Sequence, residues 1–326
     1  MKNILRALSV FLFVLIIVSI RSTVTNAFDS GEGTISNPYV IKSPGELDDI
    51  SDELDAYYIL GNDIDMTDYH LTPIGNYSNP FTGRLDGDGY SILNLSARTT
   101  LIEFGGGDYP DAYTMAMFGV IGGSAEIYDL GLTLNYVFDD QDIGDIIGGD
   151  ILVGGLVGLV DSSDVSIYDV WISGSIDVTV ASPMNFVSIG GLIGEAYNQY
   201  IYGMSYSGEI KVDLGEYLGS SLEGLSTGGI IGYAENTSLS ESTVFDSTLE
   251  VISNSEYDSV GGLVGYAYND YLDDYDIISD SVVDNLTIKA SGNNSVGGVV
   301  GYVYDDSGYT NYIHNNWVKN STFIGG

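Results

Sequence analysis

The pentapeptide GGLVG at residues 154–158 returns as GGLIG at 190–194, GGIIG at 228–232, GGLVG at 261–265 and GGVVG at 297–301. Successive copies therefore start 36, 38, 33 and 36 residues apart, and a weaker copy, MAMFG, precedes them at 115–119. A fixed period of this length is the sequence signature of a solenoid, in which each repeat buries its apolar face against the next. The repeated glycines are Gly154, Gly155, Gly158, Gly190, Gly191, Gly194, Gly228, Gly229, Gly232, Gly261, Gly262, Gly265, Gly297, Gly298 and Gly301.

Short alternating segments follow each pentapeptide. Residues 127–130 and 167–170 give one kind of segment, and residues 175–180 and 287–290 give another. Apolar and polar residues alternate with period two in these runs, which are β-branched and too short for helices. Three short strands in about 36 residues predict an all-β fold, a parallel β-helix or β-solenoid with one coil per repeat.

The repeated glycines have a structural explanation and a functional alternative. We expect them to permit tight corners and positive φ angles where a side chain would clash. A phosphate-binding loop would need a helix after the glycines and an accompanying Lys-Ser/Thr pair, and the sequence has neither. The sequence therefore favours the structural role.

The first 27 residues have the pattern of a secretory signal peptide. A short basic segment precedes an apolar stretch at residues 7–20, and Ala27 supplies a small residue for cleavage. The alternative is an uncleaved anchor, but the stretch falls short of the ~20 residues that span a bilayer. We therefore expect an extracellular or cell-surface protein. If the segment stays uncleaved, it is the only part expected to contact a membrane.

Residues 28–114 differ from the repeats, and we expect them to form an N-terminal cap and the first coils. The sequence SPGE at 43–46 is a helix-capping box with proline at the first helical position, and a short helix should run to about Leu54. Strands are expected at 57–60 and 91–95. Residues 80–90, lying between these strands, should cover the end of the stack, because an open stack edge invites aggregation.

Residues 115–326 should form the repeat solenoid, whose last coil lacks a third strand. This incomplete coil predicts either a fragment of a longer protein or end-to-end self-association through the open edge.

Charge and composition exclude several classes of protein. The chain has 46 Asp plus Glu against 9 Lys plus Arg, a formal charge of -37, so it lacks the basic face that nucleic-acid binding needs. Cysteine is absent, which excludes disulfides and thiolate chemistry. Scattered acids of this kind resemble a surface adapted to high salt and also maintain solubility. Six Asn-x-Ser/Thr sequons permit glycosylation, at Asn76, Asn94, Asn236, Asn285, Asn293 and Asn320.

Together these features resemble the secreted GLUG-repeat proteins, named for a Gly-Leu-x-Gly coil motif. The resemblance covers residues 29–326 and includes the opening segments 33–41, 62–66, 72–75 and 81–87. It implies a β-solenoid of the extracellular, adhesin-like kind. The same motif decorates some bacterial immunoglobulin-A-cleaving metallopeptidases outside their catalytic part, so the resemblance implies fold and compartment more than chemistry.

Candidate catalytic groups are sparse. A zinc peptidase would need a His-Glu-x-x-His helix, whereas the only histidines are His70, expected in a loop, and His314. No Gly-x-Ser-x-Gly elbow is present. A pair of Asp or Glu side chains catalyses hydrolysis in most glycosidases, and the sequence has two clusters of acids. Both clusters lie in predicted turns without a nearby Lys or Arg, so we expect them to be solvent-exposed acidic loops. They are Asp139, Asp140, Asp142 and Asp145, and Asp270, Asp273, Asp274 and Asp276.

Calcium is the one cofactor for which the sequence offers candidates. Asp63, Asp65, Asp86 and Asp88 place hard oxygen ligands in turns, two of them beside glycines. Neither segment fits an EF-hand loop, and both coincide with segments of the GLUG resemblance, so turn geometry is their first expected role.

The sequence therefore predicts a noncatalytic secreted or cell-surface module for adhesion, envelope structure or the binding of a glycan or protein partner. The alternative is a carbohydrate-active β-helix enzyme, a polysaccharide hydrolase or lyase. We predict that the protein is not an enzyme, because enzymes on this fold usually break the repeat to build a cleft, whereas residues 154–301 barely vary.

Overall fold

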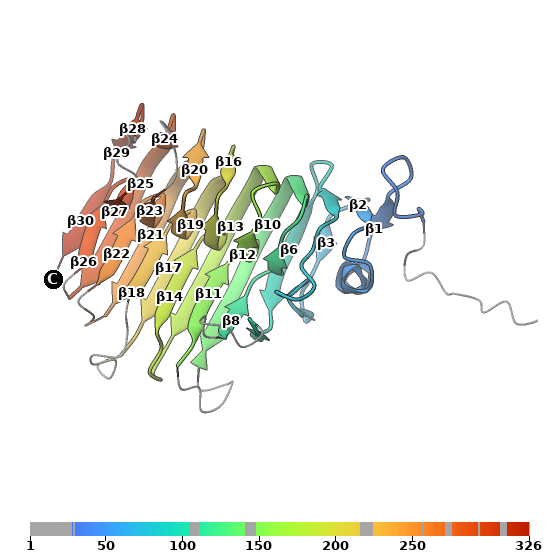
Figure 1. Cartoon of the computed structure of the whole chain (residues 1–326), viewed down its shortest axis with the longest axis horizontal. Helices are drawn as coiled ribbons and strands as arrows, with labels where there is room; N and C mark the ends of the chain where they lie inside the picture. Colours follow the sequence, from blue (N-terminus) through green and yellow to red (C-terminus); the bar gives the residue numbers. More distant parts are fainter. Residues whose placement is uncertain are drawn as a thin grey trace, which may run out of the picture.

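The computed structural model describes residue 28 and residues 30–104, 111–140, 148–215, 224–253, 255, 257–270, 276–292, 294–306 and 312–325. Within them the chain forms a stack of parallel β coils, with one short helix near its N-terminal end (Figure 1). The all-β solenoid predicted from the pentapeptide spacing is confirmed.

Three sheets run along the stack in the described part of the chain, and their strands pair in parallel apart from one antiparallel pair at the N-terminal end of the seven-stranded sheet. One has 17 strands, one has seven and one has six. The seven-stranded sheet contains β7 (Thr100–Ile102), β8 (Ala112–Met115), β11 (Asp150–Gly154), β14 (Phe186–Gly190), β18 (Gly224–Gly228), β22 (Asp258–Gly261) and β26 (Asn294–Gly297). The six-stranded sheet contains β9 (Phe118–Ile121), β12 (Val157–Asp161), β15 (Ile193–Tyr197), β19 (Ile231–Glu235), β23 (Val264–Asn269) and β27 (Val300–Asp305).

The 17-stranded sheet extends from the N-terminal region to the last coil. It contains β1 (Tyr39–Ile41), β2 (Tyr57–Leu60), β3 (Ile64–Asp65), β4 (His70–Leu71), β5 (Arg84–Asp86), β6 (Ser91–Ala97), β10 (Glu126–Asp139), β13 (Ser166–Thr179), β16 (Tyr200–Tyr202), β17 (Ser205–Asp213), β20 (Ser238–Ser240), β21 (Thr243–Ile252), β24 (Asp276–Ser279), β25 (Val282–Ser291), β28 (Tyr312–His314), β29 (Trp317–Lys319) and β30 (Thr322–Gly325). Strands at equivalent positions in successive coils pair in register, as Ile172 does with Tyr206.

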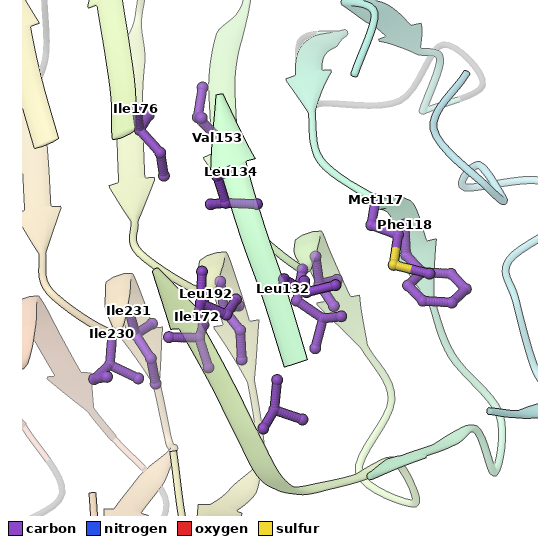
Figure 2. Packing of buried hydrophobic residues seen from close by; sticks show 14 of the residues in the cluster. Met117, Phe118, Leu132, Leu134, Val153, Ile172, Ile176, Leu192, Ile230 and Ile231 are labelled. Atoms are coloured by element: carbon purple, nitrogen blue, oxygen red, sulfur yellow. The ribbon is translucent and has the colours of Figure 1, made fainter. Parts of the chain in front are cut away.

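Each pentapeptide forms the corner between the seven-stranded and six-stranded sheets. Its third residue points into the core and is fully buried at Leu156, Leu192, Ile230 and Leu263. Backbone N–H groups bond coil to coil at this corner, from Leu156 to the Leu192 carbonyl at 2.9 Å and from Leu192 to the Ile230 carbonyl at 3.0 Å. Figure 2 shows Leu192 and Ile230 among the core side chains, with Leu134 and Ile172 from the 17-stranded sheet.

The corners require glycine because neighbouring backbone atoms approach too closely to leave room for a side chain. The expectation that these glycines adopt positive φ is wrong. None of the fifteen has a positive φ. A Cβ on Gly228 would meet the Ile231 carbonyl oxygen of its own coil, and a Cβ on Gly191 would meet the Gly229 carbonyl oxygen of the next coil. Positive φ falls instead mainly on Asn, Asp and other glycines at the remaining corners, such as Asp169 and Gly203. Short polar side chains tolerate that conformation.

The predicted helix is present, but its α-helical part is shorter than expected. Helix α2 (Pro44–Asp48) begins after Ser43, and the 3-10 turn η1 (Asp49–Asp52) continues it. The Ser43 hydroxyl accepts a hydrogen bond from the Glu46 N–H at 3.3 Å, while the Glu46 carboxylate accepts one from the Lys42 N–H at 2.8 Å. Leu47 and Ile50 are fully buried against the first strands.

A substitution tests the corner. Gly228→Ala should destabilise the protein by at least about 2 kcal/mol, because the new methyl group overlaps backbone atoms that cannot move without breaking the coil register. Gly45→Ala is the matched control, since a Cβ there meets no atom within 4 Å. Urea unfolding followed by far-ultraviolet circular dichroism measures both. Equal midpoints for the two variants would contradict the proposed role of the corner.

Candidate functional site

The outward faces of the seven-stranded and six-stranded sheets enclose a groove of about 920 Å³. Because each pentapeptide bends the chain sharply, the strands on either side of it diverge, and their outward side chains face one another across the groove. Its lining residues are Tyr77, Phe104, Asp150, Leu152, Leu159, Asp161, Asn185, Phe186, Ser188, Glu195, Tyr197, Gly224, Ser226, Tyr233, Glu235, Tyr257, Tyr266 and Tyr268.

One side of the groove, the serine wall, is a column of small hydroxyl side chains. Ser188 pairs in register with Ser226, and Ser226 pairs with Ser259 in the following coil. All three are buried by the neighbouring strands. Phe186 and Tyr257 are exposed near this wall and extend the aromatic surface of the groove.

The opposite side, the tyrosine wall, carries two neighbouring columns from β15, β19 and β23. Glu195 pairs with Tyr233, and Tyr197 pairs with Glu235, so the acids lie on one diagonal and the tyrosines on the other. Further along the axis both columns are tyrosines. The members of the wall are Glu195, Tyr197, Tyr233, Glu235, Tyr266 and Tyr268.

Hydrogen bonds hold the two glutamates in place. The Ser188 hydroxyl donates to Glu195 Oε1 at 2.6 Å across the groove, and the Tyr197 hydroxyl donates to Glu195 Oε2 at 2.9 Å. The Tyr233 hydroxyl donates to Glu235 Oε2 at 3.0 Å. Each Tyr–Glu pair spans two residues of one strand, because the side-chain period of a strand is two.

The tyrosine rings beyond the acids form a continuous stack. The rings of Tyr233 and Tyr266 have centroids 5.5 Å apart and lie 16° from parallel, and Tyr266 and Tyr302 are 5.3 Å apart. Tyr268 and Tyr304 stack at 5.5 Å in the neighbouring column. The groove therefore presents aromatic surface at the spacing of the coils.

Burial shifts the titration of the carboxyl groups in the groove. Burial raises the pKa of Glu195, the hydrogen bonds from Ser188 and Tyr197 oppose that rise, and the charge of Glu235 adds to it. Burial, followed by the charge of Asp270, raises the pKa of Glu235, and burial raises that of Asp161. The pKa of Tyr197 and that of Tyr233 are also raised, first by burial and then by the neighbouring glutamates.

Apolar side chains close the N-terminal end of the groove. Tyr77 and Phe104 meet edge to face with centroids 4.7 Å apart. Leu152 and Leu159 are buried there in a small apolar cluster with Ile102. An enclosed aromatic surface with a few fixed polar groups is the usual form of a site for an organic ligand.

Of the four calcium candidates, Asp65 and Asp86 end strands β3 and β5, and Asp63 and Asp88 lie close to these strands in the chain. The side chains of Asp63, Asp65 and Asp86 bond to protein groups. Asp63 accepts a hydrogen bond from the Ser91 N–H at 2.8 Å. Hydrogen bonds from the Asn94 side-chain amide at 3.0 Å, the Thr67 hydroxyl at 2.7 Å and the Thr67 N–H at 3.0 Å lower the pKa of Asp65 to about 2. Asp86 accepts a hydrogen bond from the Asp88 N–H at 2.9 Å. Across the described residues, no three His, Cys, Asp or Glu side chains gather into a metal-binding group. Calcium binding stays a prediction.

The described members of the two predicted acid clusters do not line the groove. Asp140 is fully buried and accepts hydrogen bonds from the N–H groups of Ala181 at 2.9 Å and Ser182 at 2.6 Å. Asp270 bonds with Asn236 at 2.9 Å. The described members thus order turns, whereas Asp142, Asp145, Asp273 and Asp274 lie outside the described residues, as does the side chain of Asp276.

Sequence reasoning missed the groove although its signal was present. The residues after each pentapeptide follow a pattern, with Glu195-Ala196-Tyr197 as one variant. Aligning the pentapeptides would have placed these residues in outward columns. The partner wall was harder to find, because Ser188 and Ser226 precede the pentapeptides and reach the same groove only through the corner.

Comparisons with known proteins give partial matches. No protein-family profile matches the sequence. A protein of Evansella cellulosilytica, provisionally named a Gly-rich membrane protein, is 31% identical over 170 residues, which cover 48% of this chain and 18% of that protein. Halomucin of Haloquadratum walsbyi is 30% identical over 177 residues, 44% of this chain and 2% of that protein. This chain therefore spans less than a fifth of the length of either relative.

The fold also resembles a crystal structure from Bacteroides ovatus, a protein provisionally named an immunoglobulin A1 protease. The match has a TM-score of 0.43 and 18% identity, and it covers 92% of this chain and 86% of the other. Because a chain of similar fold is named a protease, the prediction that this protein is not an enzyme is corrected and does not stand. A likeness at this level assigns no protease activity to the chain. Among the described residues no helix is long and apolar enough to cross a membrane.

The raised pKa values predict how stability depends on pH. The folded chain keeps protons on Glu195 and Glu235 above their ordinary pKa of 4.5, where the unfolded chain has lost them. Their contribution to stability is complete below that value and declines as pH rises through the raised pKa. The melting temperature of the wild type should therefore fall as pH rises above about 4.5 and through the raised pKa values. Glu195→Gln should flatten this slope, and the exposed Glu209→Gln should not; equal slopes for all three proteins would contradict the burial effect.

Proposed function

We propose that this chain belongs to a secreted or cell-surface β-solenoid of the GLUG-repeat type that binds an extended glycan in its groove. The GLUG resemblance of residues 29–326 and the names of the two relatives, a membrane protein and a halomucin, support the location. Residues 1–27 would act as the secretion signal.

The groove carries the assignment to a glycan. Its tyrosine wall repeats along the stack axis, with rings 5.5 Å apart from one coil to the next at Tyr233 and Tyr266. A ligand that follows this axis meets an equivalent aromatic face and hydroxyl column at every coil, which suits a polymer with a short repeating unit. Aromatic faces pack against the C–H faces of sugars, while tyrosine hydroxyls, serines and carboxylates bond their hydroxyl groups.

The charge of the groove excludes nucleic acids and other polyanions as its ligands. Asp161, Glu195 and Glu235 line it, and the chain carries a formal charge of -37. Nucleic acids and other polyanions would be repelled, since their binding depends on neutralising phosphates with basic side chains. A neutral or cationic polysaccharide meets no such barrier.

Glycan hydrolysis is a second candidate, favoured by the pair Glu195 and Glu235. Two carboxyl groups with raised pKa values in one groove are the groups that glycosidases use, one as acid and the other as base or nucleophile. Binding and hydrolysis share the groove, so one set of variants tests both.

Binding should depend on the tyrosine wall. Tyr233→Ala is expected to weaken binding of a neutral N-acetylglucosamine hexamer, or of the best ligand in a panel of neutral hexasaccharides, by about tenfold. Tyr202→Ala is the matched control, because Tyr202 also ends a tyrosine stack, at 5.4 Å from Tyr168, but lies on the 17-stranded sheet. Isothermal titration calorimetry measures both. Equal losses in the two variants, or no binding of any neutral hexasaccharide or of a glucosamine hexamer, would overturn the proposal.

Hydrolysis can be measured in the same samples by assaying the release of new reducing ends from the polysaccharide. If the second candidate holds, Glu195→Gln and Glu235→Gln should each lower turnover by at least about a hundredfold, the scale of general acid–base catalysis, while ligand binding persists. Intact polysaccharide after prolonged incubation with wild-type protein would reject hydrolysis and leave binding as the function.

A further inference from the structure

We propose that the groove selects a polysaccharide whose sugars carry free protonated amines, such as a glucosamine polymer, over its neutral N-acetylated counterpart. This proposal rests on the proposed function, because it assumes that a glycan occupies the groove. Three features point to this selection. Glu195 and Glu235 have no lysine or arginine beside them in the groove, Glu195 can accept further hydrogen bonds, and the hydroxyl group of Ser226 is available to a ligand.

Among the described residues, no lysine or arginine lines the groove beside Asp161, Glu195 and Glu235. Every lysine and arginine after residue 27 lies in the described part of the chain, and none of the six lines the groove. Four of them lie within ion-pair distance of acids on the 17-stranded sheet. These contacts are Arg84 with Glu126 at 3.4 Å, Lys211 with Asp177 at 3.7 Å, Lys289 with Glu250 at 2.9 Å and Lys319 with Asp284 at 3.1 Å.

Glu195 retains capacity for a ligand. Each of its carboxylate oxygens accepts one hydrogen bond, from Ser188 and from Tyr197. A carboxylate offers about four lone-pair sites, so two remain to accept from an ammonium group. The tyrosine faces beside it attract the same cation through their negative π surface. The charge of Glu195 and the faces of the neighbouring tyrosine rings therefore both favour a protonated amine beside Glu195.

Ser226 shows that the groove also has a vacancy for a neutral polar group. Its side chain is about nine-tenths buried and lines the groove. Its counterpart Ser188 donates to Glu195, but in the coil of Ser226 the residue opposite is Tyr233, which donates to Glu235 instead. The Ser226 hydroxyl group thus makes no hydrogen bond to another described residue. This hydroxyl group can therefore bond to a hydroxyl group of a ligand in the groove.

An amino sugar combines both requirements in one repeating unit. Its amine meets the carboxylates, its hydroxyl groups meet Ser226, and its ring packs against tyrosine. A basic peptide offers the charge without the regular hydroxyls. A calcium ion would need six to eight converging oxygens, whereas Glu195 and Glu235 stand on a diagonal and are each tied to a tyrosine of their own strand.

Titration calorimetry with two hexasaccharides tests the selection. A glucosamine hexamer is compared with an N-acetylglucosamine hexamer at about pH 6, where a free amine with a pKa near that of an α-amino group is protonated. The charge of a bound ammonium group opposes the burial that raises the pKa of Glu195 and Glu235 and so favours their ionised forms. We expect wild-type protein to bind the glucosamine hexamer at least about tenfold more tightly, with the difference shrinking as salt is raised. Glu235→Gln should remove most of the preference while binding of the N-acetylated hexamer persists.

Two controls distinguish the site from general charge attraction. Glu209→Gln removes one exposed carboxylate from β17, outside the groove, and should leave the preference unchanged. Hexalysine should bind at least about tenfold more weakly than the glucosamine hexamer. Melting curves verify that each variant is folded, and Glu195→Gln repeats the test at the second acid.

The outcomes separate the two proposals. Equal affinity for the two hexamers, a preference lowered equally by Glu209→Gln, or hexalysine binding as tightly as the glucosamine hexamer would each overturn the amine selection and leave glycan binding intact. Failure of both hexamers to bind would overturn glycan binding in the groove and the selection together.

Discussion

Close contact between backbones at the glycine corners is the constraint on which the rest of the structure depends. The carbonyl oxygen of Gly229 occupies the space where a side chain of Gly191 would lie, and equivalent contacts join the corners of neighbouring coils. Because no side chain separates the two coils there, the chain turns sharply between β14 and β15 while the ladders on both sides keep their register. The sharp turn also makes the two sheets diverge outward, and that divergence creates the groove.

The coil architecture was predictable because its determinants are local and repeated. The pentapeptide at 190–194 carries its own geometric requirement, and the alternating segments beside it define which side chains are buried. The capping box at Ser43 and Glu46 was equally local. The positive φ angles were assigned to the wrong residues, since the corner glycines are needed for space, whereas Asp169 and its equivalents adopt the left-handed conformation.

The groove was not predicted because its walls come from opposite sides of a corner. Ser188 and Glu195 are seven residues apart and meet through a hydrogen bond of 2.6 Å that exists only once the corner has its angle. The sequence instead offered clusters of adjacent acids as candidate catalytic groups. Of these, Asp140 is buried and bonds to backbone N–H groups. In a repeat protein, a site is formed by residues one period apart, so neighbours in sequence are a poor guide to neighbours in space.

The two glutamates interrupt a surface that would be more stable without them. Tyr233, Tyr266 and Tyr302 form a continuous ring stack, and Glu195 stands at the next position of that column. A tyrosine there would extend the stack, whereas the glutamate places a partly buried carboxyl group in a groove without a cation and has its pKa raised by that burial. Local choices in a repeat normally agree with the fold, and exceptions that cost stability concentrate at functional positions. The acids of the tyrosine wall are exceptions of this kind, so the proposed binding role of the groove accounts for them better than a role in holding the coils together.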